Sequence, residues 1–380
     1  MKILHTSDWH VGKVLKGHRR VDEHKAVLAE LVGIARTERP DLVLVAGDLF
    51  DTATPGAEAK RIVTRALSAL RGTGAQVVAI GGNHDNGPEL DALRPWAEAA
   101  GVALRGTVRS AAEHVLTGTT AGGEDWRLVA LPFLSQRYAV RATEMFELTA
   151  AEATQTYADH VARLLAVLCA GFTAGTVNLV TAHLTVVGAK AGGGEREAQT
   201  IQSYAVPATV FPSSAHYVAL GHLHRRQQVP GPCPVHYCGS PLAVDFGEEE
   251  NTPSVSVVEV TAETPAKVRE VPVSAATPLR TVRGSLAELS TMDPGTAWLR
   301  VYVREQPRAG LREEVQALLP QALEVRIDPQ LMDPAKGGSR AAQRSGRSPR
   351  DLFADYLTSR GHDDEAVRTL FDRLYDEVSS

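Results

Sequence analysis

Five short clusters of aspartate, asparagine and histidine carry the residue types of this sequence that could do chemistry. They are Asp8-Trp9-His10, Gly47-Asp48-Leu49-Phe50-Asp51, Gly82-Asn83-His84-Asp85, Thr181-Ala182-His183 and Gly221-His222-Leu223-His224. Carboxylate, amide and imidazole groups are ligands for divalent cations, and imidazole is also the usual general acid or base near neutral pH. These residue types indicate metal-assisted or acid–base chemistry.

Each cluster directly follows a short run that we interpret as a β-strand. The runs are Ile3–Thr6, Val43–Ala46, Val77–Ile80, Asn178–Val180 and Tyr217–Leu220. In open α/β sheets, ligands bind beyond the carboxyl ends of the strands. We therefore expect all five clusters to meet at one edge of the sheet. Any one of them alone could be an ordinary turn or a capping residue, so the prediction rests on the whole set and its order.

The set of motifs resembles the calcineurin-like metallophosphoesterase superfamily. The segments "HTSDWHVGK", "AGDLFD", "GGNHD", "ALGHLHR" and "CGSPLAVDFGEEE" are similar, more narrowly, to the SbcD family, which supplies the exonuclease component of SbcCD. The resemblance covers motifs across residues 1–250 and, more loosely, the domain order to the C-terminus. It implies an αββα sandwich that hydrolyses phosphodiester bonds with two divalent ions, which clamp the attacking and leaving oxygens.

The resemblance also implies how the ligands divide between the two ions. Asp48 would bridge both ions, with Asp8, His10 and His224 completing one and Asn83, His183 and His222 the other. Mixed imidazole, carboxylate and amide ligands suit manganese, iron or zinc better than magnesium, and we expect two Mn²⁺ ions. A water between the two cations would lose a proton readily and become the nucleophile.

His84 stands beside a ligand in the sequence but is not expected to bind metal. By resemblance it faces the phosphate, stabilises the transition state and protonates the leaving oxygen. Asp51 matches the position that orients this histidine in related phosphatases, and some relatives carry a histidine there. The alternative for Asp51 is N-capping of the helix predicted from Glu58. For Asp85 we expect a structural role in the turn.

Several further features have two interpretations. Arg19, Arg20, Arg225 and Arg226 adjoin the clusters and could hold DNA phosphates, or they could be a solvated basic surface. The glycine-rich segment from Gly188 to Gly194 lacks the phosphate-binding P-loop pattern, and we interpret it as a loop that flanks the site.

Alternation of strand and helix patterns predicts an α/β core. The predicted strands are Lys2–Thr6, Leu42–Ala46, Val77–Ile80, Arg127–Leu131, Val177–Thr181 and Tyr217–Leu220. Helical spacing marks Val27 to Ala35, Arg61–Leu70 and Ala153–Leu168. Beyond residue 272 a small α+β unit is expected, with strands Trp298–Val303 and Leu323–Ile327 around a helix Leu311–Leu319.

We accordingly divide the chain into four parts. Residues 1–272 form the metallophosphoesterase domain, 273–335 an α+β capping domain, 336–348 a basic linker and 349–380 a helical tail. In the tail, Ser348 and Pro349 favour a helix start, and Gly361 separates it from a second helix. Apolar side chains then follow at helical spacing: Leu352, Phe353, Tyr356, Leu357, Val367, Leu370, Phe371, Leu374, Tyr375 and Val378. The helices either fold back on the chain's own core or, as the resemblance suggests, dock on the coiled-coil base of an SbcC-type ATPase.

Composition is that of an ordinary globular protein of 380 residues, with 43% hydrophobic and 22% charged residues. Three cysteines make no disulfide framework, and no apolar run is long enough to span a membrane. We expect a cytoplasmic location. The net charge of −5 neither supports nor excludes DNA as a partner.

The hypothesis that best accounts for the whole chain is a DNA exonuclease and endonuclease that processes DNA ends and hairpins in repair and recombination. The resemblance implies a homodimer joined to two copies of the SbcC-type SMC-like ATPase. A phosphatase or cyclic-nucleotide phosphodiesterase would share the metal motifs but would need no extra domain or tail. A non-catalytic scaffold would have lost ligands, and every expected ligand is present here.

Overall fold

The computed structural model describes residues 1–135, 157–195, 204–331, 353–354, 357–358 and 365–379. The chain divides into two compact units. The first comprises Met1–Val282, Asp293–Arg300 and Pro320–Glu324, and the second comprises Arg283–Met292, Val301–Leu319 and Val325–Ser380. Among the described residues, no helix has the length and apolar character needed to cross a membrane.

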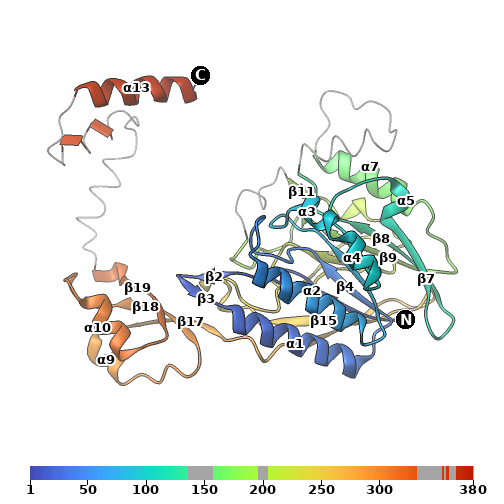
Figure 1. Ribbon diagram of the computed structural model, residues 1–380, viewed down its shortest axis with the longest axis horizontal. Helices are drawn as coiled ribbons and strands as arrows, with labels where there is room; N and C mark the ends of the chain where they lie inside the picture. Colours follow the sequence, from blue (N-terminus) through green and yellow to red (C-terminus); the bar gives the residue numbers. More distant parts are fainter. Residues whose placement is uncertain (136–156, 196–203, 332–352, 355–356, 359–364, 380) are drawn as a thin grey trace. The chain divides into compact units, whose positions relative to one another are not determined.

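One six-stranded sheet has the order β16-β15-β1-β4-β5-β6, and two of its strands, β4 and β15, are labelled in Figure 1. Its strands β1, β4, β5 and β6 are parallel, while β15 and β16 extend it in antiparallel fashion. The bounds are β1 (Lys2–Thr6), β4 (Leu42–Ala46), β5 (Gln76–Ile80), β6 (Val102–Arg105), β15 (Ser254–Glu259) and β16 (Lys267–Pro272).

The second six-stranded sheet has the order β13-β14-β12-β9-β8-β7. Here β8, β9, β12 and β14 are parallel, and the two edge strands are antiparallel to their neighbours. The bounds are β7 (Val115–Thr119), β8 (Asp125–Leu131), β9 (Val177–His183), β12 (Tyr217–Gly221), β13 (Gln227–Val229) and β14 (Val235–Tyr237).

Three layers of buried apolar side chains hold these sheets and their helices together. Ile3 and Leu44 of the first sheet pack against Leu128 and Leu179 of the second, which places the two sheets face to face. The outer face of the first sheet is covered by α1 (Val21–Glu38), α2 (Ala57–Arg71), α3 (Gly87–Ala92) and α4 (Arg94–Ala99). The outer face of the second is covered by α7 (Tyr157–Cys169), with α5 (Ala111–His114) beside it. The expected αββα sandwich is confirmed.

Short elements complete this part of the chain. They are β2 (Val14–Leu15), β3 (His18–Arg19), β10 (Thr185–Val186), β11 (Ala205–Val206) and the 3₁₀ turns η2 (Ala208–Val210) and η3 (Phe246–Glu248).

A separate three-stranded sheet has the order β17-β18-β19. Its strands are β17 (Leu279–Gly284), β18 (Trp298–Val303) and β19 (Ala322–Ile327), and the helices α9 (Leu286–Ser290) and α10 (Leu311–Leu318) contact each other. A capping box between Ser285 and Glu288 starts α9. The turn η4 (Pro329–Leu331) follows, and the tail ends in α13 (Glu365–Ser379). The predicted starts at Ser348 and Pro349, and Gly361, lie outside the described residues.

One expectation about the layout is wrong: the five clusters do not share one sheet. The first three follow β1, β4 and β5. The fourth forms the end of β9 and the fifth begins at the last residue of β12, and both of these strands belong to the other sheet. Alternation of strand and helix predicts parallel strands but does not reveal that the chain moves from one sheet to a second. Site residues therefore come from both sheets.

Gly221, the last residue of β12, is where the two sheets approach most tightly near the clusters. A Cβ atom at this position would lie 1.9 Å from the main-chain oxygen of Ala46, which ends β4. A contact this short is impossible, so any side chain would push the ends of the two sheets apart.

We expect Gly221→Ala to lower the free energy of unfolding by about 1–3 kcal/mol, because the added methyl group overpacks a rigid contact between main chains. Urea denaturation in the presence of EDTA measures the fold without a contribution from bound metal. Gly175→Ala is the matched control, since a Cβ atom there meets no atom within 4 Å. Equal stability of the two variants would contradict the close approach of the sheets.

Candidate metal centre

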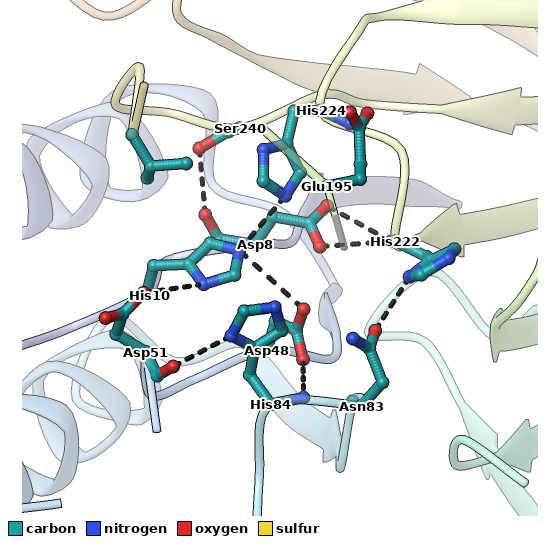
Figure 2. A network of polar contacts seen from close by, with 12 residues as sticks. Asp8, His10, Asp48, Asp51, Asn83, His84, Glu195, His222, His224 and Ser240 are labelled. Carbon is teal, nitrogen blue, oxygen red and sulfur yellow. Dashed lines mark hydrogen bonds and ion pairs between the residues drawn. The ribbon is translucent and has the colours of Figure 1, made fainter. Parts of the chain in front are cut away.

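The seven side chains expected to bind metal lie between the carboxyl ends of the two sheets, and Figure 2 labels six of them: Asp8, His10, Asp48, Asn83, His222 and His224. The seventh, His183, is the last residue of β9. Potential ligand atoms of His/Cys/Asp/Glu groups lie within 4.8 Å of one another in three buried sets among the described residues. The sets are Asp8, His10 and His224; His10, Asp48 and His84; and Asp48, His183 and His222.

Four of these residues adopt a left-handed backbone that non-glycine residues rarely use. The φ angles are 54° at Asp8, 45° at His10, 51° at Asp48 and 100° at His222. Such conformations cost of order 1–3 kcal/mol each and persist where the surrounding structure over-determines them. Here main-chain hydrogen bonds join the loops, from Asp8 N to Gly47 O at 3.0 Å and from His10 N to Asp48 O at 3.0 Å.

Asp8, His10 and His224 form the first group. The Nε2 atoms of the two histidines lie 3.0 Å apart. The Asp8 carboxylate accepts hydrogen bonds from the main-chain N–H of His222, at 3.0 and 3.3 Å, and from the Ser7 hydroxyl. Burial raises the pKa of Asp8 to about 6, although the neighbouring histidines favour its ionised form. Burial likewise lowers the pKa of His10 to about 3.

Asn83, His183 and His222 surround a second point. The amide Oδ1 of Asn83 lies 2.8 Å from Nε2 of His183 and 2.7 Å from Nδ1 of His222. His183 donates its Nδ1 hydrogen to the main-chain oxygen of Ala46 at 2.8 Å, which aims Nε2 into the site. Burial disfavours the imidazolium of His183, but Asp48 and Asp8 outweigh it and raise its pKa to about 9.

Asp48 lies between the two groups. Its Oδ2 atom is 3.7 Å from Nε2 of His10 and 3.5 Å from Nε2 of His183, and its Oδ1 accepts the main-chain N–H of His84 at 2.8 Å. Burial opposes ionisation, but the histidines around Asp48 hold its pKa well below the usual value. A Cβ atom at Gly82 would lie 2.1 Å from its Oδ1, so the GNHD turn packs directly on this carboxylate.

This arrangement of donors fits divalent cations. Buried carboxylate, amide and imidazole groups face one another across 2.7–3.7 Å, and such groups are normally paired or coordinate a metal. The carboxylates of Asp48 and Asp8 also raise the pKa of His183, because a proton on its ring supplies positive charge next to them.

His84 contacts Asp51, the residue expected to orient it, through a main-chain atom of Asp51. Its Nδ1 donates to the main-chain oxygen of Asp51 at 2.8 Å, rather than to the carboxylate of that residue. That carboxylate lies 3.6 Å from Nδ1 of His10 and 3.3 Å from Nζ of Lys13. Although burial acts in the opposite direction, His10 and Lys13 lower the pKa of Asp51 to about 2. The capping alternative is wrong, because α2 has Gly56 at its N-cap.

Asp85 has the structural role expected of it, over a longer range than its own turn. Its carboxylate accepts main-chain N–H groups of Gly82 at 2.8 Å, Leu49 at 3.1 Å and Phe50 at 2.9 Å. The loops after β4 and β5 are thereby tied together.

Comparison with known proteins assigns the fold and the family. A family model described as calcineurin-like phosphoesterase matches residues 1–226, and one described as type 5 capsule protein repressor C-terminal domain matches residues 275–361. A Bacillus subtilis protein, named as the SbcD component of the nuclease SbcCD, is 33% identical over 325 residues, covering 82% of this chain and 81% of the relative. The chain belongs to the SbcD family.

Other SbcD proteins match in the same way. The Rhodobacter capsulatus protein is 36% identical and covers 65% of this chain and 64% of its own length. The Escherichia coli K12 protein is 33% identical, covering 76% of this chain and 72% of the relative. The resemblance inferred from the motif segments is thus confirmed.

Some residues of this SbcD centre are not predicted from sequence. Ser7 contacts Asp8, and Glu248, only 1% exposed, lies 2.7 Å from Nδ1 of His224. Glu195 accepts the main-chain N–H of His224 at 2.8 Å. The one signal in the sequence is the segment "CGSPLAVDFGEEE", which contains Glu248 but supports only the family resemblance.

The basic residues near the clusters do not behave alike. Arg20 is 1% exposed and binds Glu23 at 2.7 Å and the main-chain oxygen of Ala243, so a role in holding DNA phosphates is wrong for this residue. Arg19 has a side chain that is 75% exposed and lies 3.7 Å from Glu58. Arg226 lies 3.6 Å from Glu270.

A cavity of about 860 Å³ opens beside the centre, with Asn83 in its wall. Phe133 and Val108 supply apolar surface, and Arg109 and Thr107 supply polar groups. Ligand sites commonly combine apolar walls with a few placed polar groups in volumes of roughly 300–1,000 Å³.

Proposed function

We propose that this chain is the nuclease component of an SbcCD-type complex that hydrolyses phosphodiester bonds of DNA and processes ends and hairpins in repair and recombination. The observation that carries the proposal is the convergence of the seven clustered side chains from both sheets. The curated SbcD relatives are named as nucleases, and the chain spans most of the length of the first of them. Chromosomal DNA as a substrate also favours a cytoplasmic location.

The centre would hold two divalent ions. Asp8, His10 and His224 would hold one, Asn83, His183 and His222 would hold the other, and Asp48 would be shared. Oxygen and imidazole ligands in this mixture favour Mn²⁺ over magnesium. When bound, the two ions would supply Lewis-acid stabilisation of the phosphate and a water of lowered pKa.

His84 would serve the substrate rather than the ions. The main-chain oxygen of Asp51 can only accept a hydrogen bond, so Nδ1 of His84 carries a hydrogen and the ring is fixed in orientation. Its Nε2 would donate a proton to the leaving oxygen or a hydrogen bond to the phosphate. Asp51 would act through this contact and through its carboxylate beside His10.

Loading the protein with manganese should give about two ions per chain, and Asp48→Ala should lose both because each would lose a shared ligand. Metal analysis after gel filtration measures this directly. Asp22→Ala is the control, because it removes a carboxylate that is 97% exposed on α1, and it should keep both ions. One ion in the wild type, or two in Asp48→Ala, would contradict the shared carboxylate.

His84→Gln should keep both ions and the fold, because the main-chain contact of His84 with Asp48 does not involve its side chain. Cleavage should fall by roughly two to four orders of magnitude, as for a lost general acid or charge-stabilising donor. Single-turnover cleavage of a labelled duplex at saturating manganese measures the chemical step. Normal cleavage by this variant would remove His84 from the mechanism.

The tail is proposed to bind the SbcC-type ATPase, with two copies of this chain in a heterotetramer. The rings of Phe353 and Phe371 stack with centroids 4.1 Å apart, and Leu357 is 7% exposed. Val367 and Leu370 of α13 are nevertheless 39% and 47% exposed. An apolar helix face of this kind supports docking in a helical groove.

Deleting residues 349–380 should abolish co-purification with SbcC while leaving manganese-dependent cleavage by the isolated chain. The double variant V367D/L370D should have the same effect, because charges cannot be buried at a helix interface without a large cost. The double variant A366D/T369D adds the same charge elsewhere on α13 and should still bind. Binding by V367D/L370D, or loss of isolated activity on deletion, would favour a tail that folds on the chain's own core.

A further inference from the structure

The imidazole of His224 contacts a carboxylate on the side that faces away from the proposed metal site. This carboxylate, Glu248, is not among the expected metal ligands. Oε1 of Glu248 lies 2.7 Å from Nδ1 of His224. Because an ionised carboxylate can only accept, Nδ1 carries a hydrogen and Nε2 is left facing His10 and Asp8. The other oxygen of Glu248 accepts the main-chain N–H of Val244 at 3.1 Å, which fixes the carboxylate itself.

A second carboxylate holds the main chain of the same histidine. Oε1 of Glu195 accepts the N–H of His224 at 2.8 Å, and Figure 2 shows the two residues side by side. Oε2 of Glu195 accepts the N–H groups of Gly193 at 2.8 Å and Gly194 at 3.1 Å. The end of the glycine-rich segment is thus folded around this carboxylate.

The glycines of this segment are required by space as well as by hydrogen bonding. A Cβ atom at Gly194 would lie 1.8 Å from Oε1 of Glu248, and one at Gly192 would lie 2.9 Å from Cβ of His224. The segment therefore packs directly on the ligand and on the residue that orients it.

The two ligand groups differ in the partner of a histidine Nδ1 atom, which is a carboxylate for His224. In the second group, Nδ1 of His183 donates to the neutral main-chain oxygen of Ala46. A carboxylate behind an imidazole makes the ring a stronger electron donor and fixes its tautomer, and loss of such a partner typically costs 10–100-fold in metal affinity.

We propose that Glu248 and Glu195, with the glycines around Glu195, are positioning residues for His224 and selectively set the affinity of the cation held by Asp8, His10 and His224. This inference rests on the proposed two-ion centre. It assigns the glycine-rich segment a part in metal binding, in contrast to a loop that merely flanks the site.

Titration of the full-length protein with Mn²⁺, followed by electron paramagnetic resonance, tests the proposal. Two neighbouring Mn²⁺ ions give a spin-coupled signal, and a single ion gives an isolated six-line signal. Glu248→Ala should lower the affinity for one of the two ions by roughly 10–100-fold and leave the affinity for the other unchanged. At a concentration that fills the wild type, this variant should show the isolated signal, and the coupled signal should return at higher Mn²⁺.

Three further variants separate positioning from a general loss of structure. Glu248→Gln keeps an oxygen that accepts from Nδ1 of His224 and should lose less affinity than Glu248→Ala. Gly194→Ala should lower the affinity for the same ion, because the added methyl group displaces the Glu248 carboxylate. Glu250→Gln removes an exposed charge two residues away and should bind both ions as the wild type does.

The possible outcomes are distinct. Unchanged binding by Glu248→Ala, or equal weakening of both ions, overturns the proposal. If the wild type binds only one ion, the two-ion part of the proposed function fails. The positioning role is then decided on that one ion, and an affinity unaffected by Glu248→Ala overturns it. Thermal denaturation shows whether each variant is folded, and Glu248→Gln provides the test if Glu248→Ala is not.

Discussion

The carboxylate of Asp8 joins the two sheets at the point where their strands end. It belongs to the loop after β1, yet it accepts the main-chain N–H of His222, which follows β12 in the other sheet. The main-chain oxygen of the same residue accepts the Ser240 hydroxyl at 2.8 Å. This contact joins two ligand candidates from different sheets, Asp8 and His222, and both have a left-handed backbone.

Such a centre is costly to fold without cations. Asp8 and Asp48 are both buried, and burial, with a smaller contribution from the Asp48 carboxylate, raises the pKa of Asp8. Four backbone positions in the left-handed region add strain. A ligand that binds only the folded state stabilises it in proportion to its occupancy. Metal binding should therefore raise the free energy of unfolding of the two-sheet sandwich, because the contacts that form the centre also join the two sheets.

Much of the sandwich could be predicted because its central strands contain short runs of apolar, often β-branched residues. β1 and β4 begin and end at the predicted residues, and the clusters meet, although at the ends of two sheets and not at the edge of one as expected. Prediction failed where a partner is distant in sequence. β15 pairs with β1 across more than 250 residues, and neither strand carries a local sign of that pairing. Arg20 looked like a surface cation, but it is buried and donates to the main-chain oxygen of Ala243, more than 200 residues away. The choice between carboxylate and main-chain oxygen at Asp51 depends on a few ångströms of loop geometry.

The net charge of −5 is compatible with DNA as a substrate when the positions of the charged residues are considered. The residues in and around the centre include the carboxylates of Asp8, Asp48, Asp51, Glu195 and Glu248, while nearby arginines such as Arg20 and Arg226 are engaged by Glu23 and Glu270. On its own residues the centre would repel a phosphate. Two divalent cations would add four positive charges at the point where a phosphate binds, which would offset most of this negative charge. Phosphate binding at this centre would therefore depend on the metals, so the net charge of the sequence does not by itself exclude DNA as a substrate.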